Sequence, residues 1–233
     1  MSSRKEEKRK HKEELQAVAI RKQKWSGMLL KGGLALLIPL VLYVFLQGLV
    51  TGAKSLPPDV VGEADHVRGN PDAALTLTVY ADFQCPACLT ETDVISRAWP
   101  QISDKVKVVF RHYPLDIHRH AFLAARYAEA AGRQDKFWEM HDVLYGNQTL
   151  WSVVEDPTAI FDGYARDVGL DPEQLKVDID LAEVRNKILA DQRGGTRAGV
   201  RGTPSLFFNG RLVSNPQSSA DLVARVNKAL EEG

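Results

Sequence analysis

Cysteine is scarce in this sequence, since only two occur among its 233 residues, at positions 85 and 88. One closely spaced pair leaves no cysteine over for the structural disulfides that stabilise many exported domains. A structural zinc site needs four ligands, and only a mixed site with His112, His118 and His120 would supply them. The spacing Cys-x-x-Cys is instead typical of a catalytic redox pair.

Charged side chains are absent from residues 32–50, which read GGLALLIPLVLYVFLQGLV. At about 1.5 Å per residue a helix over this stretch is roughly 29 Å long, close to the thickness of the bilayer hydrocarbon. The run predicts a single transmembrane helix over residues 28–50, in which Pro39 is tolerated. A cleavable signal peptide is the alternative: its apolar region is shorter, but residues 51–53 (TGA) resemble a cleavage site.

The net charge of zero conceals an uneven distribution of charge. Residues 1–31 contain ten Lys and Arg against four Glu, whereas the remainder is acidic. Basic residues before a span stay in the cytoplasm, so residues 1–27 are predicted to be a cytoplasmic tail. We therefore expect a single-pass protein of the cell membrane whose catalytic domain lies outside the cytoplasm. A nucleic-acid-binding arm is the alternative for the basic run, and we expect no nucleic-acid partner.

Residues 51–64 contain Gly and Pro and are predicted to be a linker, and residues 65–233 a folded domain. The β-branched and aromatic runs predict strands, and the segments with apolar residues one turn apart predict helices. The expected strands are 75–80, 106–112, 206–208 and 212–213, and the expected helices are 86–99, 121–131, 135–144, 158–168, 182–192 and 219–231. This order predicts an α/β sheet domain with a helical insertion at about 117–195.

The two cysteines fall where the first strand of this domain gives way to a helix. Cys85 is expected at the helix start, where free backbone N–H groups and the helix dipole favour a thiolate. Pro86 suits the first turn because it needs no partner for its nitrogen, and Ala87 completes the dipeptide between the cysteines. We expect Cys85 to be the exposed attacking thiol and Cys88 the buried resolving thiol.

Three separated segments resemble the DsbA-like branch of the thioredoxin superfamily. They are YADFQCPAC at 80–88, FWEMH at 137–141 and GVRGTPSLFFNG at 199–210. The resemblance spans about residues 66–230 and implies a thioredoxin fold with a helical insertion, preceded here by the membrane anchor. It also implies that Pro204 is a cis-proline facing the cysteines, with Thr203 beside it pairing with an extended substrate. On the residues alone, an ordinary trans proline is as good a reading.

The resemblance implies thiol–disulfide exchange on exported proteins that carry thiols, without a metal or a cofactor other than the Cys85–Cys88 disulfide. We predict a disulfide-donating oxidase that a membrane redox partner reoxidises. A membrane-tethered reductase is the alternative, because Pro86-Ala87 stands where the strong oxidases of this branch have Pro-His. A tethered binding or chaperone module without turnover is an alternative from another class. No dimerisation domain of the kind found in disulfide isomerases is evident.

Other polar residues near these motifs have simpler interpretations. Asp82 is predicted to cap the helix or form a turn, with proton transfer as the alternative. The histidines at positions 112, 118 and 120 are expected to be exposed in loops. Residues 147–149 (NQT) match a glycosylation sequon, a short pattern that occurs often by chance.

Overall fold

The computed structural model describes residues 55–232. The predicted tail and transmembrane helix, at 1–27 and 28–50, lie outside the described residues. Within 55–232 no helix combines the length and the apolar character that crossing a membrane requires.

A sheet of five strands, in the order β1-β3-β2-β4-β5, forms the centre of the described region. β2 and β3 are parallel, and the other neighbours are antiparallel. The strands are β1 (His66–Gly69), β2 (Leu75–Ala81), β3 (Val106–His112), β4 (Ser205–Phe208) and β5 (Arg211–Val213). Asn209 and Gly210 join β4 to β5 with positive φ values of 44° and 81°, as the expected Asn-Gly hairpin turn requires.

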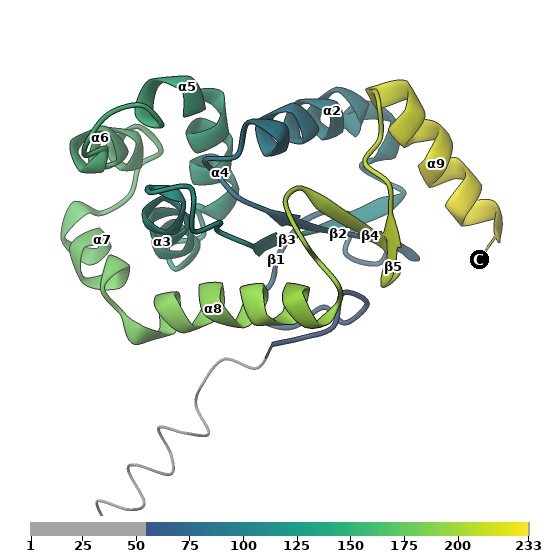
Figure 1. Ribbon diagram of the computed structural model, residues 1–233, viewed down its shortest axis with the longest axis horizontal. Coiled ribbons are helices and arrows are strands. Elements are labelled where there is room, and N and C mark those ends of the chain that lie inside the picture. The colour runs from purple at the N-terminus through teal and green to yellow at the C-terminus, as the bar shows by residue number, and fades with distance from the viewer. Residues whose placement is uncertain (1–54, 233) are drawn as a thin grey trace, which may run out of the picture. The chain divides into compact units, whose positions relative to one another are not determined.

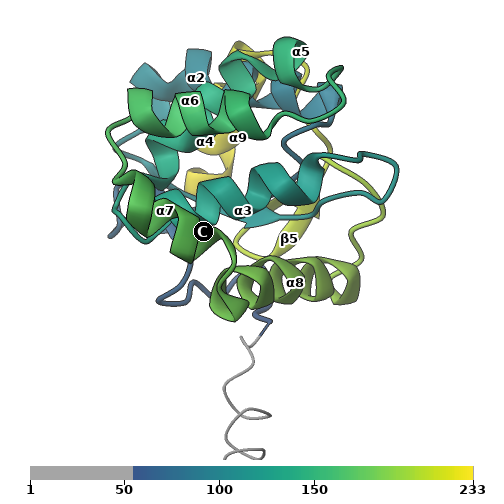
Figure 2. The same cartoon turned by 90° about the vertical axis from the view of Figure 1, so that its left-hand side faces the viewer.

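Helices cover both faces of the sheet (Figure 1). On the upper face in that view, α2 (Pro86–Ile102) packs against the C-terminal helix α9 (Ser219–Glu232). On the lower face lies α8 (Ala182–Arg197). The remaining helices come between β3 and α8 and gather at one end of the sheet (Figures 1 and 2). They are α3 (Ala121–Gly132), α4 (Phe137–Gly146), α5 (Gln148–Trp151), α6 (Thr158–Asp167) and α7 (Pro172–Ile179).

All seven residues of β2 are buried, because the strand lies between β3 and β4 with its two faces covered. The alternation in its sequence LTLTVYA places Leu77 and Val79 in the main apolar core. Tyr80 points to the other face, where it packs on Phe207 with ring centroids 5.6 Å apart. β2 is therefore a rigid support for whatever follows its C-terminal end.

Residues 55–65, most of the predicted linker, pack against the domain. The buried Arg111 of β3 donates hydrogen bonds to the carbonyls of Leu56, Pro57 and Val60, at 3.1, 2.9 and 2.6 Å. Its guanidinium also pairs with Asp65 at 2.8 Å. The segment is thus fixed to the sheet on the side that α8 covers (Figure 1).

The helix that contains Cys88 is longer than predicted. We expected it to end at Trp99 before Pro100, but α2 continues to Ile102 with Pro100 inside it. The proline removes one hydrogen bond to the carbonyl four residues earlier, at Ser96. Ser96 is exposed, so water can satisfy that carbonyl and the last turn survives.

Candidate active site

The turn between β2 and α2 presents the cysteine pair. Asp82 holds this turn together, because its carboxylate accepts a hydrogen bond from the Gln84 amide at 2.7 Å and its carbonyl accepts one from the Cys85 amide at 3.1 Å. Cys85 is the N-cap residue of α2, with extended backbone angles, and Pro86 occupies the first turn as predicted. Asp82 therefore has the turn-forming role that the sequence favoured.

Cys85 and Cys88 are both free thiols, and both are largely buried. Cys85 keeps 7% of its surface exposed and Cys88 keeps 1%. The expectation of an exposed Cys85 is wrong in degree, because the Thr203 carbonyl covers its sulfur at 3.6 Å, where it accepts a hydrogen bond from the protonated thiol. The expected difference between the two thiols remains, since only Cys85 offers an edge to solvent.

The surroundings of the two sulfurs drive their pKa values apart. The Cys88 thiol, with smaller contributions from the nearby Thr203 side chain and from the Cys88 and Ala87 amides, lowers the pKa of Cys85 to about 5 despite its burial. Burial, followed by the interaction with Cys85, raises the pKa of Cys88 far above that of an ordinary thiol. At neutral pH the pair is thus a thiolate at Cys85 beside a protonated thiol at Cys88, as a nucleophile and its resolving partner require.

The loop before β4 closes the other side of the site. The Thr203–Pro204 peptide bond is cis, as the resemblance implied. The Thr203 hydroxyl is buried and has no hydrogen-bond partner within residues 55–232. It adjoins both sulfurs and favours their ionised forms. The substrate-binding role expected of Thr203 and Pro204 stays a prediction.

Residues between β3 and α6 hold the segment that precedes Cys85, mostly through their main-chain groups. The buried Asp82 carboxylate accepts hydrogen bonds from the Leu115 amide and from His118 Nδ1, both at 2.8 Å. The Gln84 side chain accepts one from the His120 amide at 2.7 Å and donates one to the Ser152 carbonyl at 3.1 Å. The sequence motifs did not reveal these contacts, because all the partners except His118 are main-chain groups that no side-chain pattern marks.

The histidines are not the exposed loop residues that we expected. His112 and His120 are buried, and His118 is half-buried. His112 contacts Glu129 at 2.7 Å, whereas His120 contacts the Val154 carbonyl at 2.8 Å and His118 contacts Asp82. The three side chains therefore have separate partners and do not converge on the cysteines as a mixed zinc site would require.

A second polar cluster lies away from the cysteines, where ligand atoms of His112, Glu129 and Asp191 come within 4.8 Å of one another. Lys187 places its ammonium 2.8 Å from both Asp191 oxygens. It also contacts Asp65 at 3.2 Å. The lysine supplies the positive charge that a metal ion would otherwise provide, so the cluster is a buried ion-pair network.

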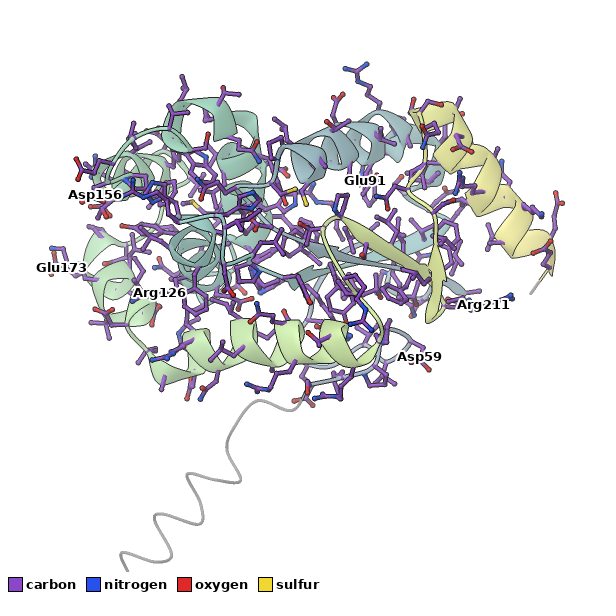
Figure 3. The ribbon with its side chains drawn as sticks, in the orientation of Figure 1. Asp59, Glu91, Arg126, Asp156, Glu173 and Arg211 are labelled. Atoms are coloured by element: carbon purple, nitrogen blue, oxygen red, sulfur yellow. The ribbon has the colours of Figure 1, made fainter. Side chains whose placement is uncertain are left out.

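Glu91 is a buried acid near the cysteines that the sequence analysis missed. It lies one turn after Cys88 on the side of α2 that faces the sheet (Figure 3). One of its carboxylate oxygens has no hydrogen-bond partner among the described residues, and burial raises its pKa to about 7. Glu91, Cys88 and Pro204 line the same cavity of about 390 Å³ beneath α2. Its position one turn from Cys88 was visible in the sequence, but its burial was not.

A low-pKa thiolate, a buried resolving thiol and a facing cis-proline loop, on this fold, define a thiol–disulfide oxidoreductase whose redox group is the cysteine pair itself. The pattern of the thioredoxin family matches residues 62–228. The chain therefore belongs to the thioredoxin family, and the predicted fold class of the domain is confirmed.

Two solved structures illustrate the same fold. A thioredoxin-like oxidoreductase from Silicibacter pomeroyi DSS-3 is 27% identical, with a TM-score of 0.63 over 73% of this chain and 94% of that one. BdbD from Bacillus subtilis is 20% identical, with a TM-score of 0.66 over 77% of this chain and 100% of that one.

Curated relatives are much longer than this chain. The Na(+)/H(+) antiporter NhaA 1 of Mycolicibacterium gilvum is 37% identical over 191 residues, which cover 76% of this chain and 29% of that protein. The protein of the same name from Salinispora arenicola is 35% identical over 185 residues, covering 79% of this chain and 28% of that protein. The chain thus spans less than a third of the length of these relatives.

Proposed function

We propose that this protein is a disulfide-donating oxidase of exported proteins. The observation that carries the proposal is the environment of Cys85, whose sulfur meets first-turn amides of α2, the Cys88 thiol and the Thr203 hydroxyl. All of these groups stabilise a thiolate, which exists only in the reduced enzyme. Stabilising the reduced form makes the disulfide a stronger oxidant.

The reaction follows from the two thiol environments. A substrate thiolate attacks Cys85 Sγ of the disulfide, forming a mixed disulfide and releasing Cys88, which takes up a proton. A second substrate thiolate then attacks the substrate sulfur and releases Cys85 as a thiolate. The substrate is oxidised by two electrons and the enzyme is reduced, so a membrane redox partner must reoxidise the cysteine pair for turnover.

The rim of the site supports an extended polypeptide as substrate. Three large aliphatic side chains are exposed on segments that contact the active-site turn: Ile117 at 83%, Leu150 at 60% and Val153 at 81%. Exposed aliphatic side chains of this kind can contact the apolar side chains that an unfolded chain exposes. The Thr203 backbone beside Cys85 would pair with the main chain of that substrate, and the aliphatic rim would hold residues flanking its cysteine.

We further propose that the protein is anchored in the cell membrane with this domain outside the cytoplasm. The uncharged run at 32–50 and the basic residues before it support this placement. The curated relatives carry the matched region in proteins named antiporters, and exchange of ions across a membrane requires a membrane-spanning protein. Labelling Cys85 in intact cells with a membrane-impermeant thiol reagent, after a membrane-impermeant reductant has opened the Cys85–Cys88 disulfide, tests the orientation. A domain on the cytoplasmic side would stay unlabelled.

The reduction potential decides the direction of electron flow. The full-length protein in detergent micelles is equilibrated with glutathione buffers, and the oxidised fraction of the cysteine pair is measured. A potential at or above roughly −200 mV supports a disulfide donor, whereas one near about −270 mV contradicts it and favours the tethered reductase. A Cys85→Ser variant, which has no disulfide to exchange, provides the baseline.

A further inference from the structure

Gln148, the first residue of α5, contacts the backbone on which the redox pair is built. Its side chain is 3% exposed. The amide nitrogen donates one hydrogen bond to the Phe83 carbonyl at 2.7 Å and another to the Cys85 carbonyl at 3.0 Å. One side chain from the helical region thus binds the last turn residues and the catalytic cysteine together.

The Cys85 carbonyl affects the orientation of the first turn of α2 through its position. It also accepts hydrogen bonds from the Cys88 and Leu89 amides, at 3.1 and 3.2 Å, which close the first turn of α2. Because the next residue is Pro86, the peptide that joins Cys85 to Pro86 has no N–H group. The carbonyl is therefore the one group of this peptide that can form a hydrogen bond. Holding this carbonyl fixes the peptide plane and, with it, the direction of the amides that face the Cys85 sulfur.

Gln148 is itself held firmly. Trp151, on the same short helix, is fully buried and donates its Nε1 hydrogen to the Leu144 carbonyl at 2.7 Å. The preceding residue, Asn147, bonds the Val143 carbonyl at 2.9 Å. The junction of α4 and α5 is therefore rigid enough to impose a position on the active-site turn.

We infer that Gln148 is a positioning residue that sets how strongly the first turn of α2 stabilises the Cys85 thiolate. The inference rests on thiol–disulfide exchange at Cys85, but it does not depend on the direction of electron flow. Without the two amide hydrogen bonds, the Cys85 carbonyl is free to tilt and the facing amides lose their alignment with the sulfur. Cys85 then ionises less readily, and the disulfide becomes a weaker oxidant.

The test compares Gln148→Met and Gln148→Glu with the unchanged full-length protein. Methionine has a similar length but no donor, and glutamate has the same shape but a carboxylate that repels both carbonyls and the thiolate. We expect the ionisation constant of Cys85, followed by thiolate ultraviolet absorbance against pH, to fall about tenfold in Q148M, which corresponds to roughly 30 mV lower potential. Q148E should show the larger shift.

Asn147→Leu is the matched control, because it removes an amide–carbonyl hydrogen bond at the same junction without touching the active-site turn. It should cost stability but leave the Cys85 ionisation and the potential unchanged. A loss of stability in Q148M and Q148E with a Cys85 ionisation constant within twofold of the unchanged protein would overturn the inference. If the methionine variant fails to fold, the isosteric glutamate carries the comparison. The test compares variants with the unchanged protein, so its result can be interpreted whether the unchanged protein has the potential of an oxidase or of a reductase.

Discussion

At the scale of single residues, the site depends on which hydrogen-bond donors face the Cys85 sulfur. The Thr203 hydroxyl is one of them, because it adjoins this sulfur and has no hydrogen-bond partner within residues 55–232. We expect Thr203→Val to raise the pKa of Cys85 from about 5 by roughly one unit, since a hydrogen bond to a charged group contributes about 1.5–3 kcal/mol. The pH dependence of alkylation by iodoacetamide measures this. Thr203→Ser, which keeps the hydroxyl, should behave like the unchanged protein, and an equal shift in both variants would contradict the assignment.

Glu91 gives a prediction in which a substitution stabilises the protein. Burial raises its pKa in the folded state to about 7, against about 4.3 in the unfolded chain, so the fold favours its neutral form. Its stabilising contribution is therefore complete below about pH 4.3, falls as the pH rises towards 7, and is lost above that. We expect Glu91→Gln to raise the free energy of unfolding by about 2 kcal/mol at pH 8 and to leave it unchanged near pH 4.

Urea denaturation of the reduced protein at both pH values measures the Glu91 effect. Asp93→Asn is the control, because Asp93 is exposed on the same helix and, within residues 55–232, has Arg97 as its one charged partner. If E91Q raised the free energy of unfolding equally at both pH values, burial of the charged carboxylate would not be the cause.

At the scale of the elements, residues 55–65 and β3 depend on Arg111. Its side chain is 2% exposed, and its guanidinium holds Asp65, Tyr80 and three carbonyls of the segment. We expect Arg111→Met to cost about 3–5 kcal/mol, because it leaves the Asp65 carboxylate buried beside Lys187 alone. The double variant Arg111→Met with Asp65→Leu should cost less than the sum of the single changes. Additive losses in urea denaturation would contradict this coupling.

The sequence predicts the elements of this domain unevenly. The sequence predicts the longer elements correctly: the strands at 75–80 and 106–112 and the helix after Cys85. Their apolar residues recur at regular spacing because they are buried in one core. β1, with only four residues, was missed because it gains its order by pairing with β3, and α5 and α7 were missed because they are short and stabilised by their neighbours. Pro100 marked a helix end that tertiary packing overrides.

The candidate site was predictable to a similar extent. Cys85, Cys88, Thr203 and Pro204 come from two motifs whose order along the chain is characteristic, and the structure brings these residues together. Gln148 lies in a segment that matched only a chance sequon, and its importance arises from the fold of α5 against the active-site turn. Contacts with residues distant in the sequence help to set the pKa of a thiol, and no local sequence pattern predicts them.

At the scale of the whole molecule, the ionisation of Cys85 couples the redox state to folding. A pKa of about 5 in the fold, against about 8.5 for an ordinary thiol, stabilises the reduced folded protein. Because the folded value is the lower one, this contribution is complete above about pH 8.5 and is lost as the pH falls through 5. The oxidised protein has no thiol to ionise, and its disulfide closes a loop too short to constrain the unfolded chain strongly.

We therefore expect the reduced protein to be more stable than the oxidised protein at pH 8, by up to about 4 kcal/mol from this ionisation. The difference should shrink steadily as the pH falls from about 8.5 to 5 and approach its minimum near pH 4. Urea denaturation of both redox forms across this range measures it, with Cys85→Ser as a control that lacks the pH-dependent component. An oxidised form that is the more stable one at pH 8 would mean that the fold does not favour the thiolate, and the disulfide would then lack the driving force of an oxidase. The sign of this one difference thus connects the hydrogen bonds at a single sulfur to the direction in which the whole protein transfers electrons.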